Sequence, residues 1–255
     1  DFSIYLTEEY WDEIVDFVKS CNLNLAWDLN MRMGRTKNGS AMWDSQDAVR
    51  LLDHIAANSQ EVWAFQVGNE PGHWETRNGG SPNALVHAED FLTFRNILDK
   101  YYSNDSERPR IQGADVCKGK GTDTSPCANM TYFSDLVKRA GNVLDDITVH
   151  SYGLRGPKAG RPDECELKYF LSRKEFSSGV LRSVGQWQDD LPSNESIKLV
   201  LSETATAADG GCHNMSNRFV AGFYWVRVCV CVCFLLEVKS LPSLHTSIAN
   251  HATDT

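Results

Sequence analysis

Short apolar runs alternate along this chain with longer segments in which apolar residues recur every three or four positions. The short runs predict buried strands at residues 23–30, 62–70, 110–116, 147–152 and 197–203. The three-and-four spacing predicts helices between them. One helix begins after Thr7, a good capping residue, and the others cover residues 45–57, 88–102, 128–140, 167–187 and 214–225.

This alternation predicts an α/β fold with a parallel sheet, because parallel strands need long crossover connections, usually helical and right-handed. A (β/α)8 barrel and an open doubly wound sheet both fit the pattern. No Gly-x-Gly-x-x-Gly or Gly-Lys-Ser/Thr sequence follows any of the strands, which counts against the nucleotide-binding doubly wound folds. We therefore expect a barrel.

Two of the predicted strands end in a glutamate. Gly68-Asn69-Glu70-Pro71 closes one of them, and Ser202-Glu203-Thr204 closes the last. An isolated Asn-Glu-Pro would suit a plain polar turn equally well. In a barrel, however, all strands open on one face, so Glu70 and Glu203 would converge there.

A facing pair of carboxylates is the apparatus of glycoside hydrolysis. One group donates a proton to the leaving oxygen, and the other attacks the sugar or activates water. Asn69, directly before Glu70, can donate a hydrogen bond to a sugar hydroxyl beside the reacting carbon. The chemistry requires no cofactor and no metal, and we expect neither.

Composition narrows the class of protein further. With 255 residues, 42% hydrophobic content and a net charge of -9, the chain fits one large domain or part of one. The negative charge counts against nucleic-acid binding, and any membrane association is expected to be peripheral. Five Asn-x-Ser/Thr sequons, at Asn38, Asn104, Asn129, Asn194 and Asn214, favour a secretory route.

Eight cysteines allow disulfides, whose connectivity spacing alone does not reveal. Cys165 and Cys212 lie in loops that could approach each other. Cys229, Cys231 and Cys233 would share one face of a strand, as in a thiolate metal site, but no second cluster completes such a site. The largely apolar stretch 219–238 carries Arg227 near its centre, which counts against a membrane span.

The motifs resemble one family in particular. Gly68-Asn69-Glu70-Pro71 together with Leu201-Ser202-Glu203-Thr204 is similar to the heparanase-type retaining hydrolases, glycoside hydrolase family 79 of the large (β/α)8 clan. Further matches follow in the family's order: Asp28-Leu29-Asn30, Trp43-Asp44-Ser45, Gly113-Ala114-Asp115-Val116, Val149-His150-Ser151-Tyr152, Asp209-Gly210-Gly211 and Phe219-Val220-Ala221-Gly222-Phe223. The resemblance covers about residues 23–225.

The resemblance implies a role for each matched residue. Glu70 would be the acid/base and Glu203 the nucleophile. Asn69 would bind the sugar, Tyr152 would orient Glu203, and His150 would line the same face. The glycines of the Asp209 motif, Gly210 and Gly211, are further candidates for substrate contact.

Basic residues follow two of the predicted strands, which places them at the catalytic face. Lys118, Lys120, Arg155, Lys158 and Arg161 could be solvated loop charges, or they could bind an anionic polysaccharide through its sulfates and carboxylates. Cys117-Lys118 stands where heparanases have Gly-Gln, so the resemblance does not extend to the sugar contact that the family makes there.

The resemblance also predicts the domain organisation. Residues 1–226 would form a partial catalytic barrel with about strands 3 to 7, and another segment would supply the missing strands, since Asp1 begins mid-domain. Residues 227–255 would be an aberrant tail, because alternating Val and Cys is what a GT repeat encodes and suggests read-through into an intron.

Three functions remain open at this point. The first is cleavage of β-glucuronosyl linkages in heparan sulfate-like chains, outside the cell or in lysosomes. The second is the same reaction on hyaluronan or on small glucuronides. The third is an inactive secreted fragment, because an open barrel leaves strand edges uncovered.

Overall fold

The sheet of this protein has its strands in the same order in space as along the chain. In the computed structural model, which describes residues 5–32, 35, 42–71, 82–117, 130–158, 162–172, 191 and 197–226, five parallel strands are arranged in the order β1-β2-β3-β4-β5. In a doubly wound sheet, the order of the strands in space reverses at a switch point, so it does not follow the order along the chain. The sequential order is that of a barrel wall, as predicted.

Helices and strands alternate as the apolar pattern predicts. The elements are α1 (Glu8–Ser20), β1 (Ala26–Leu29), α2 (Gln46–Ala57), β2 (Ala64–Val67), α3 (Ala84–Tyr101), β3 (Arg110–Cys117), α4 (Met130–Ala140), β4 (Asp146–His150), α5 (Leu167–Leu171) and β5 (Lys198–Glu203). A further helical segment covers residues 220–226.

Several boundaries differ from the prediction for local reasons. Helix α3 begins four residues early because Asn83 caps it, accepting the Val86 N–H at 2.9 Å. Strand β2 stops at Val67, because Gly68 turns the backbone to a φ of +85°. The last helix does not begin at 214, since residues 213–219 form turns. Residues 173–187 of the predicted helix lie outside the described part.

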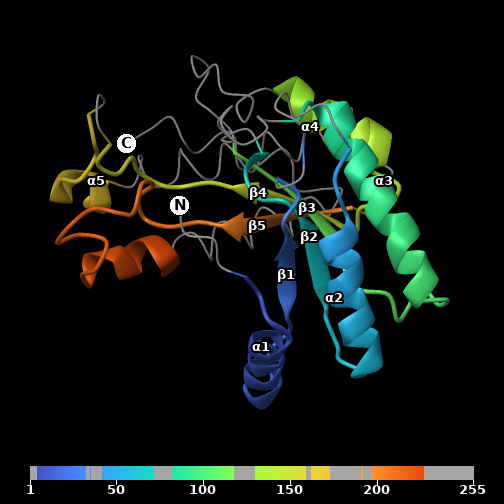
Figure 1. The fold of residues 1–255 in the computed structure, drawn as a ribbon. Coiled ribbons are helices and arrows are strands. Elements are labelled where there is room, and N and C mark those ends of the chain that lie inside the picture. The colour runs from blue at the N-terminus through green and yellow to red at the C-terminus, as the bar shows by residue number, and fades with distance from the viewer. Residues whose placement is uncertain are drawn as a thin grey trace, which may run out of the picture. The chain divides into compact units, whose positions relative to one another are not determined.

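Helices α2, α3 and α4 stand along one side of the sheet (Figure 1). An aromatic cluster fills the space between sheet and helices. The rings of Phe65 and Phe94 meet edge to face with their centroids 5.5 Å apart, and the centroids of Trp43 and Phe94 are 6.0 Å apart. All three side chains are buried. At such T-shaped contacts each ring pair adds about 1 kcal/mol beyond its burial.

Helix α1 begins at its predicted cap, with Thr7 Oγ1 accepting the Tyr10 N–H at 3.2 Å. Only part of its apolar face is covered. Trp11 and Val15 are buried, whereas Tyr10 and Phe17 are more than half exposed. The helix thus docks on the sheet through Trp11, whose ring meets Trp27 of β1 edge to face.

The chain forms two compact units, residues 1–150 with 191–202, and residues 151–190 with 203–255. The first contains the sheet up to Ser202 and helices α1 to α4. In the second, residues 153–154 run parallel to 205–208 and exchange backbone hydrogen bonds with them. A disulfide joins Cys165 to Cys212 there, so the loops that hold these two cysteines do meet.

Within the residues that the structure describes, no helix has both the length and the apolar character to cross a bilayer. The predicted tail, 227–255, and its three-cysteine tract lie outside the described residues, as do Lys118, Lys120 and Arg161. The domain division at residue 226 therefore stays a prediction.

Candidate active site

Glu70 lies in a tight turn just beyond the end of β2 rather than on the strand itself. A Cβ on Gly68 would lie 2.0 Å from the Met31 sulfur, so this position requires glycine. The Gly68 N–H donates to Asp28 Oδ1 at 3.0 Å. Glu70 itself has a φ of +42°, a backbone conformation that non-glycine residues adopt mainly where the surroundings impose it. Residues of β1 and its following loop thus fix the turn that presents Glu70.

His150, the last residue of β4, holds the Glu70 carboxylate. Its Nδ1 lies 2.8 Å from Glu70 Oε1, and its Nε2 lies 3.1 Å from Asp115 Oδ1. The His150 side chain is 2% exposed and that of Glu70 is 23% exposed. The imidazole therefore stands between two carboxylates with little water around it.

Asp115 reaches His150 because β3 is irregular at this point. The register with β4 shifts between Gly113 and Val116, and Asp115 has a φ of +49°. Its backbone N–H donates to Thr148 Oγ1 at 3.1 Å, and the Ser202 hydroxyl donates to its Oδ1 at 2.7 Å. The bulge turns a fully buried carboxylate toward the end of β4.

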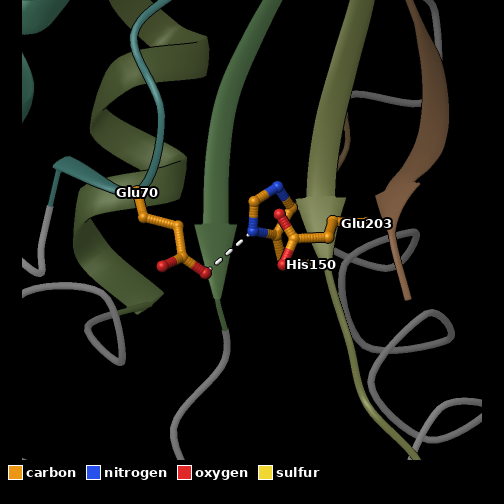
Figure 2. Close-up of side chains that lie close together, drawn as sticks. All are labelled: Glu70, His150 and Glu203. Atoms are coloured by element: carbon orange, nitrogen blue, oxygen red, sulfur yellow. Dashed lines mark hydrogen bonds and ion pairs between the residues drawn. The ribbon is translucent and has the colours of Figure 1, made fainter. Parts of the chain in front are cut away.

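Glu203 is the last residue of β5, the strand next to β4 in the sheet. One carboxylate oxygen each of Glu70 and Glu203 and one ring nitrogen of His150 all lie within 4.8 Å of one another. Figure 2 shows both carboxylates turned toward His150. Three such groups could ligate a divalent cation, but both ring nitrogens of His150 already face carboxylates, of Glu70 and of Asp115.

Asp28 adds a further carboxylate to this end of the sheet. Burial, then the nearby charge of Asp115, raises the pKa of Asp28 to about 7, although the Gly68 N–H and the charge of His150 act in the opposite direction. Water still reaches the Asp28 side chain, which screens part of this effect. A carboxyl group with a raised pKa near other acidic groups is typical of catalytic sites.

His87 of α3 supports the end of β2 from the helix side. Its Nε2 donates to the Val67 carbonyl at 2.9 Å, and its Nδ1 accepts from the Tyr132 hydroxyl at 2.8 Å, so the neutral ring satisfies both partners. Burial lowers the pKa of His87 to about 4 from its ordinary 6.5. The strand that leads to the Glu70 turn thus rests on a neutral histidine.

We expect the stabilising effect of His87 to disappear in acid. As pH falls from 6.5 to about 4, the unfolded chain takes up a proton on His87 before the folded one does. The contribution is complete above pH 6.5, and about 3 kcal/mol of it is lost by pH 4. His87→Gln, which cannot titrate, should be less stable than the wild type at pH 7.5, with a gap that narrows toward pH 4.

Denaturant unfolding of both proteins at each pH measures this gap. The test uses the difference in unfolding free energy between the two proteins, because other buried groups titrate over the same pH range. Burial raises the pKa of Asp90 to about 6 and that of Asp28 to about 7. Those carboxyl groups make the folded state gain stability as pH falls through the same range. A gap that stays constant with pH would contradict the role of His87.

The remaining predicted site residues have varied surroundings. Asn69 is exposed beside Glu70, and Tyr152 is half-buried two residues after His150. Arg155 forms an ion pair with Glu164 at 2.9 Å, while Lys158 is largely exposed, 3.8 Å from Asp209. Gly210 and Gly211 both have a φ of +83°. The roles of all these residues, and of Lys118, stay predictions.

Asp115 and Asp28 stand in motifs that point to the family, but neither was predicted to have a role. The available signal was their type and place, a carboxylate at the end of a predicted strand. Such a signal is weak, because many strands end in a polar residue that only begins a turn.

Comparison with known proteins identifies the family. The description "Glycosyl hydrolase family 79, N-terminal domain" applies to residues 3–228, most of the chain. The chain belongs to glycosyl hydrolase family 79. The resemblance inferred from the paired glutamate motifs is thereby confirmed.

The names of curated relatives of this family 79 chain state different activities. Heparanase of Bos taurus is 26% identical over 84% of the chain and 36% of the relative. Inactive heparanase-2 of Homo sapiens is 23% identical over 88% of the chain and 35% of the relative. Hyaluronoglucuronidase of Hirudo nipponia is 25% identical over 86% of the chain and 42% of the relative. The chain therefore spans well under half the length of these relatives.

A solved structure supports the fold. The 4-O-α-L-rhamnosyl-β-D-glucuronidase of Fusarium oxysporum superposes with a TM-score of 0.60 at 14% identity, covering 86% of this chain and 43% of that one. At this identity the likeness concerns the fold alone, and it agrees with the sequential parallel sheet of a glycosidase barrel.

Proposed function

We propose that the full-length protein is a retaining glycosidase that cleaves β-glucuronosyl linkages in heparan sulfate-like glycosaminoglycans. The observation that carries this proposal is the approach of Glu70 and Glu203 to within 4.8 Å of each other through one oxygen each. Retaining enzymes hold their two carboxyl groups about 5–5.5 Å apart, and inverting enzymes about 6.5–9.5 Å. Nearest oxygens within 4.8 Å of each other are compatible with the shorter, retaining arrangement.

In the first step, Glu70 protonates the glycosidic oxygen while Glu203 attacks the anomeric carbon, and a covalent glycosyl-enzyme forms as the leaving alcohol departs. In the second step, Glu70 takes a proton from water, which displaces Glu203. Asn69 lies beside Glu70 and would hold a hydroxyl of the sugar. Tyr152 would keep Glu203 oriented for attack.

Similarity to heparanases supports heparan sulfate as the substrate class. Lys158, largely exposed in the loop that follows β4, would bind a sulfate or carboxylate, together with Lys118 and Arg155. The Cys165–Cys212 disulfide and the exposed sequons at Asn104 and Asn214 suit a secreted or lysosomal protein.

Hyaluronan is the second candidate substrate, since a relative of similar identity is a hyaluronoglucuronidase. Loss of catalysis is the third alternative, in keeping with the similarity to inactive heparanase-2. The two glutamates at this spacing favour an active enzyme over that alternative.

Incubation of the full-length protein with heparan sulfate, hyaluronan and an aryl β-glucuronide separates these functions. We expect heparan sulfate to become shorter by size-exclusion chromatography, with glucuronic acid at each new reducing end. Preferential shortening of hyaluronan would transfer the assignment to that polymer. A folded protein that cleaves none of the three would contradict the proposed function, and a Glu70→Gln/Glu203→Gln double variant is the blank.

A further inference from the structure

Asp115 is a buried carboxylate that the reaction described above does not use. Its side chain is 0% exposed and accepts from the Ser202 hydroxyl, while its backbone N–H donates to Thr148 Oγ1. Its second oxygen, Oδ2, is also buried and accepts no hydrogen bond in the described part of the chain. The negative charge of Asp115 is therefore compensated mainly by the Ser202 hydroxyl and the His150 ring.

The contacts of Asp115 lead directly to the acid/base. Asp115 Oδ1 lies 3.1 Å from His150 Nε2, and His150 Nδ1 lies 2.8 Å from Glu70 Oε1. With the ring 2% exposed and Asp115 fully buried, the charges interact with little screening by water. Carboxylate, imidazole and carboxylate thus form one continuous chain of polar contacts.

We propose that Asp115 is a positioning residue for Glu70: acting through His150, it orients the imidazole toward Glu70 and keeps a proton in the Glu70–His150 pair as pH rises. A fixed negative charge on one side of the ring favours the protonated ring, and the ring then donates toward Glu70 on the other side. The inference rests on the proposed role of Glu70 as acid/base.

The proton of this pair is conserved over a turnover. In the first step the ring proton passes from His150 Nδ1 to Glu70 and on to the leaving oxygen. In the second step the attacking water returns a proton to Glu70 and the ring, so the pair ends as it began. Two other acidic groups face His150, Glu203 from β5 and Asp28 from β1. Asp115 differs from both because it contacts the ring nitrogen that points away from Glu70.

Asp115→Asn tests the inference with little change of shape. Asparagine tolerates the left-handed backbone at this position and can still accept from Ser202, so only the charge is lost. In the full-length protein, NMR follows the titration of His150, whose signal is assigned with His150→Gln. We expect the midpoint of that titration to lie above about pH 6.5 in the wild type and to fall by about one unit or more in Asp115→Asn.

The same loss of charge should appear in the kinetics. In a plot of kcat/KM against pH for an aryl β-glucuronide, the fall in activity at high pH should move to lower pH. The size of this change should be similar to the shift of the His150 midpoint seen by NMR. Ser202→Ala, which removes a hydroxyl donor but keeps the Asp115 charge, should move both midpoints by less than half as much. A merely structural role for Asp115 would lower activity at every pH without moving the pH at which activity falls.

An unchanged His150 midpoint in Asp115→Asn would overturn the inference. If Asp115→Asn does not fold, the His150 midpoint of the wild type decides. A midpoint at or below the ordinary value of about 6.5 overturns the inference, and one well above that value supports it. The NMR titration needs no substrate. A wild-type protein without turnover would therefore refute the proposed function, while the titration would still decide whether Asp115 acts on His150.

Discussion

Replacing Glu203 with glutamine should reduce kcat/KM for a β-glucuronide by on the order of 10⁴-fold or more, equivalent to about 5 kcal/mol of transition-state stabilisation. An amide cannot form the glycosyl-enzyme, while the shape at the end of β5 is kept. Steady-state kinetics on the full-length protein measures the loss. In the wild type, a 2-fluoro glucuronide should label Glu203 covalently, and Glu203→Gln should not be labelled.

Glu70→Gln is the matched comparison, because the second glutamate performs different chemistry. Its loss should slow substrates with poor leaving groups by about 10²–10⁴-fold and activated aryl glucuronides much less, since only the former need a proton. Azide gives a stereochemical check. With Glu203→Ala it should attack in place of the missing carboxylate and yield the α-azide. With Glu70→Ala it should attack the glycosyl-enzyme and yield the β-azide.

Labelling at a residue other than Glu203, or equal losses of both glutamate variants on every leaving group, would contradict the assigned roles. The assay should include circular dichroism of each variant, because Glu70 has an unusual backbone conformation and a substitution there could shift the turn.

At pH 7.5, where Asp90 is ionised, removing its charge should cost about 1–3 kcal/mol of folding stability. Burial raises the pKa of Asp90 to about 6 and so offsets part of the attraction to Arg35. Asp90 of α3 forms an ion pair with Arg35, whose side chain is 0% exposed, and it also accepts the Trp43 N–H at 3.3 Å. In Asp90→Asn, the buried guanidinium would lose its carboxylate partner. Because Arg35 also donates to the Met31 carbonyl at 2.7 Å, and Met31 packs beneath Gly68, the loop that supports Glu70 should loosen as well.

Two further variants make this stability test specific. Glu89→Gln, one residue earlier on the same helix, breaks an exposed pair with Arg139 and should change stability by less than about 1 kcal/mol. Arg35→Met combined with Asp90→Leu removes both charges and should recover much of the loss. Chemical denaturation measures all three variants. Equal effects of Asp90→Asn and Glu89→Gln would show that burial of the pair has no energetic consequence.

Much of the fold could be predicted because burial leaves a local record. The spacing of apolar residues placed five strands and the helices between them, and the Thr7 cap fixed the start of α1. Local chemistry also explains the errors. The Asn83 cap and the Gly68 turn moved boundaries by a few residues, because a single polar or flexible residue outweighs the apolar spacing around it.

The candidate site could be predicted only in part. Glu70 and Glu203 were found because each ends a predicted strand in a recognisable motif. The contact between Glu70 and His150 joins residues 80 positions apart in the sequence, and no local pattern encodes such a pair. Asp115 was missed because its place depends on a bulge, which arises from pairing between β3 and β4.

By itself, the sequence determined the alternation of strands and helices, the two glutamates at strand ends and the family resemblance, since all three are written in neighbouring residues. Only the tertiary structure decided between a barrel and a doubly wound sheet, because strand order depends on long-range pairing. Only the tertiary structure placed His150 between Glu70 and Asp115, because the three residues come from different strands and loops that meet at one end of the sheet.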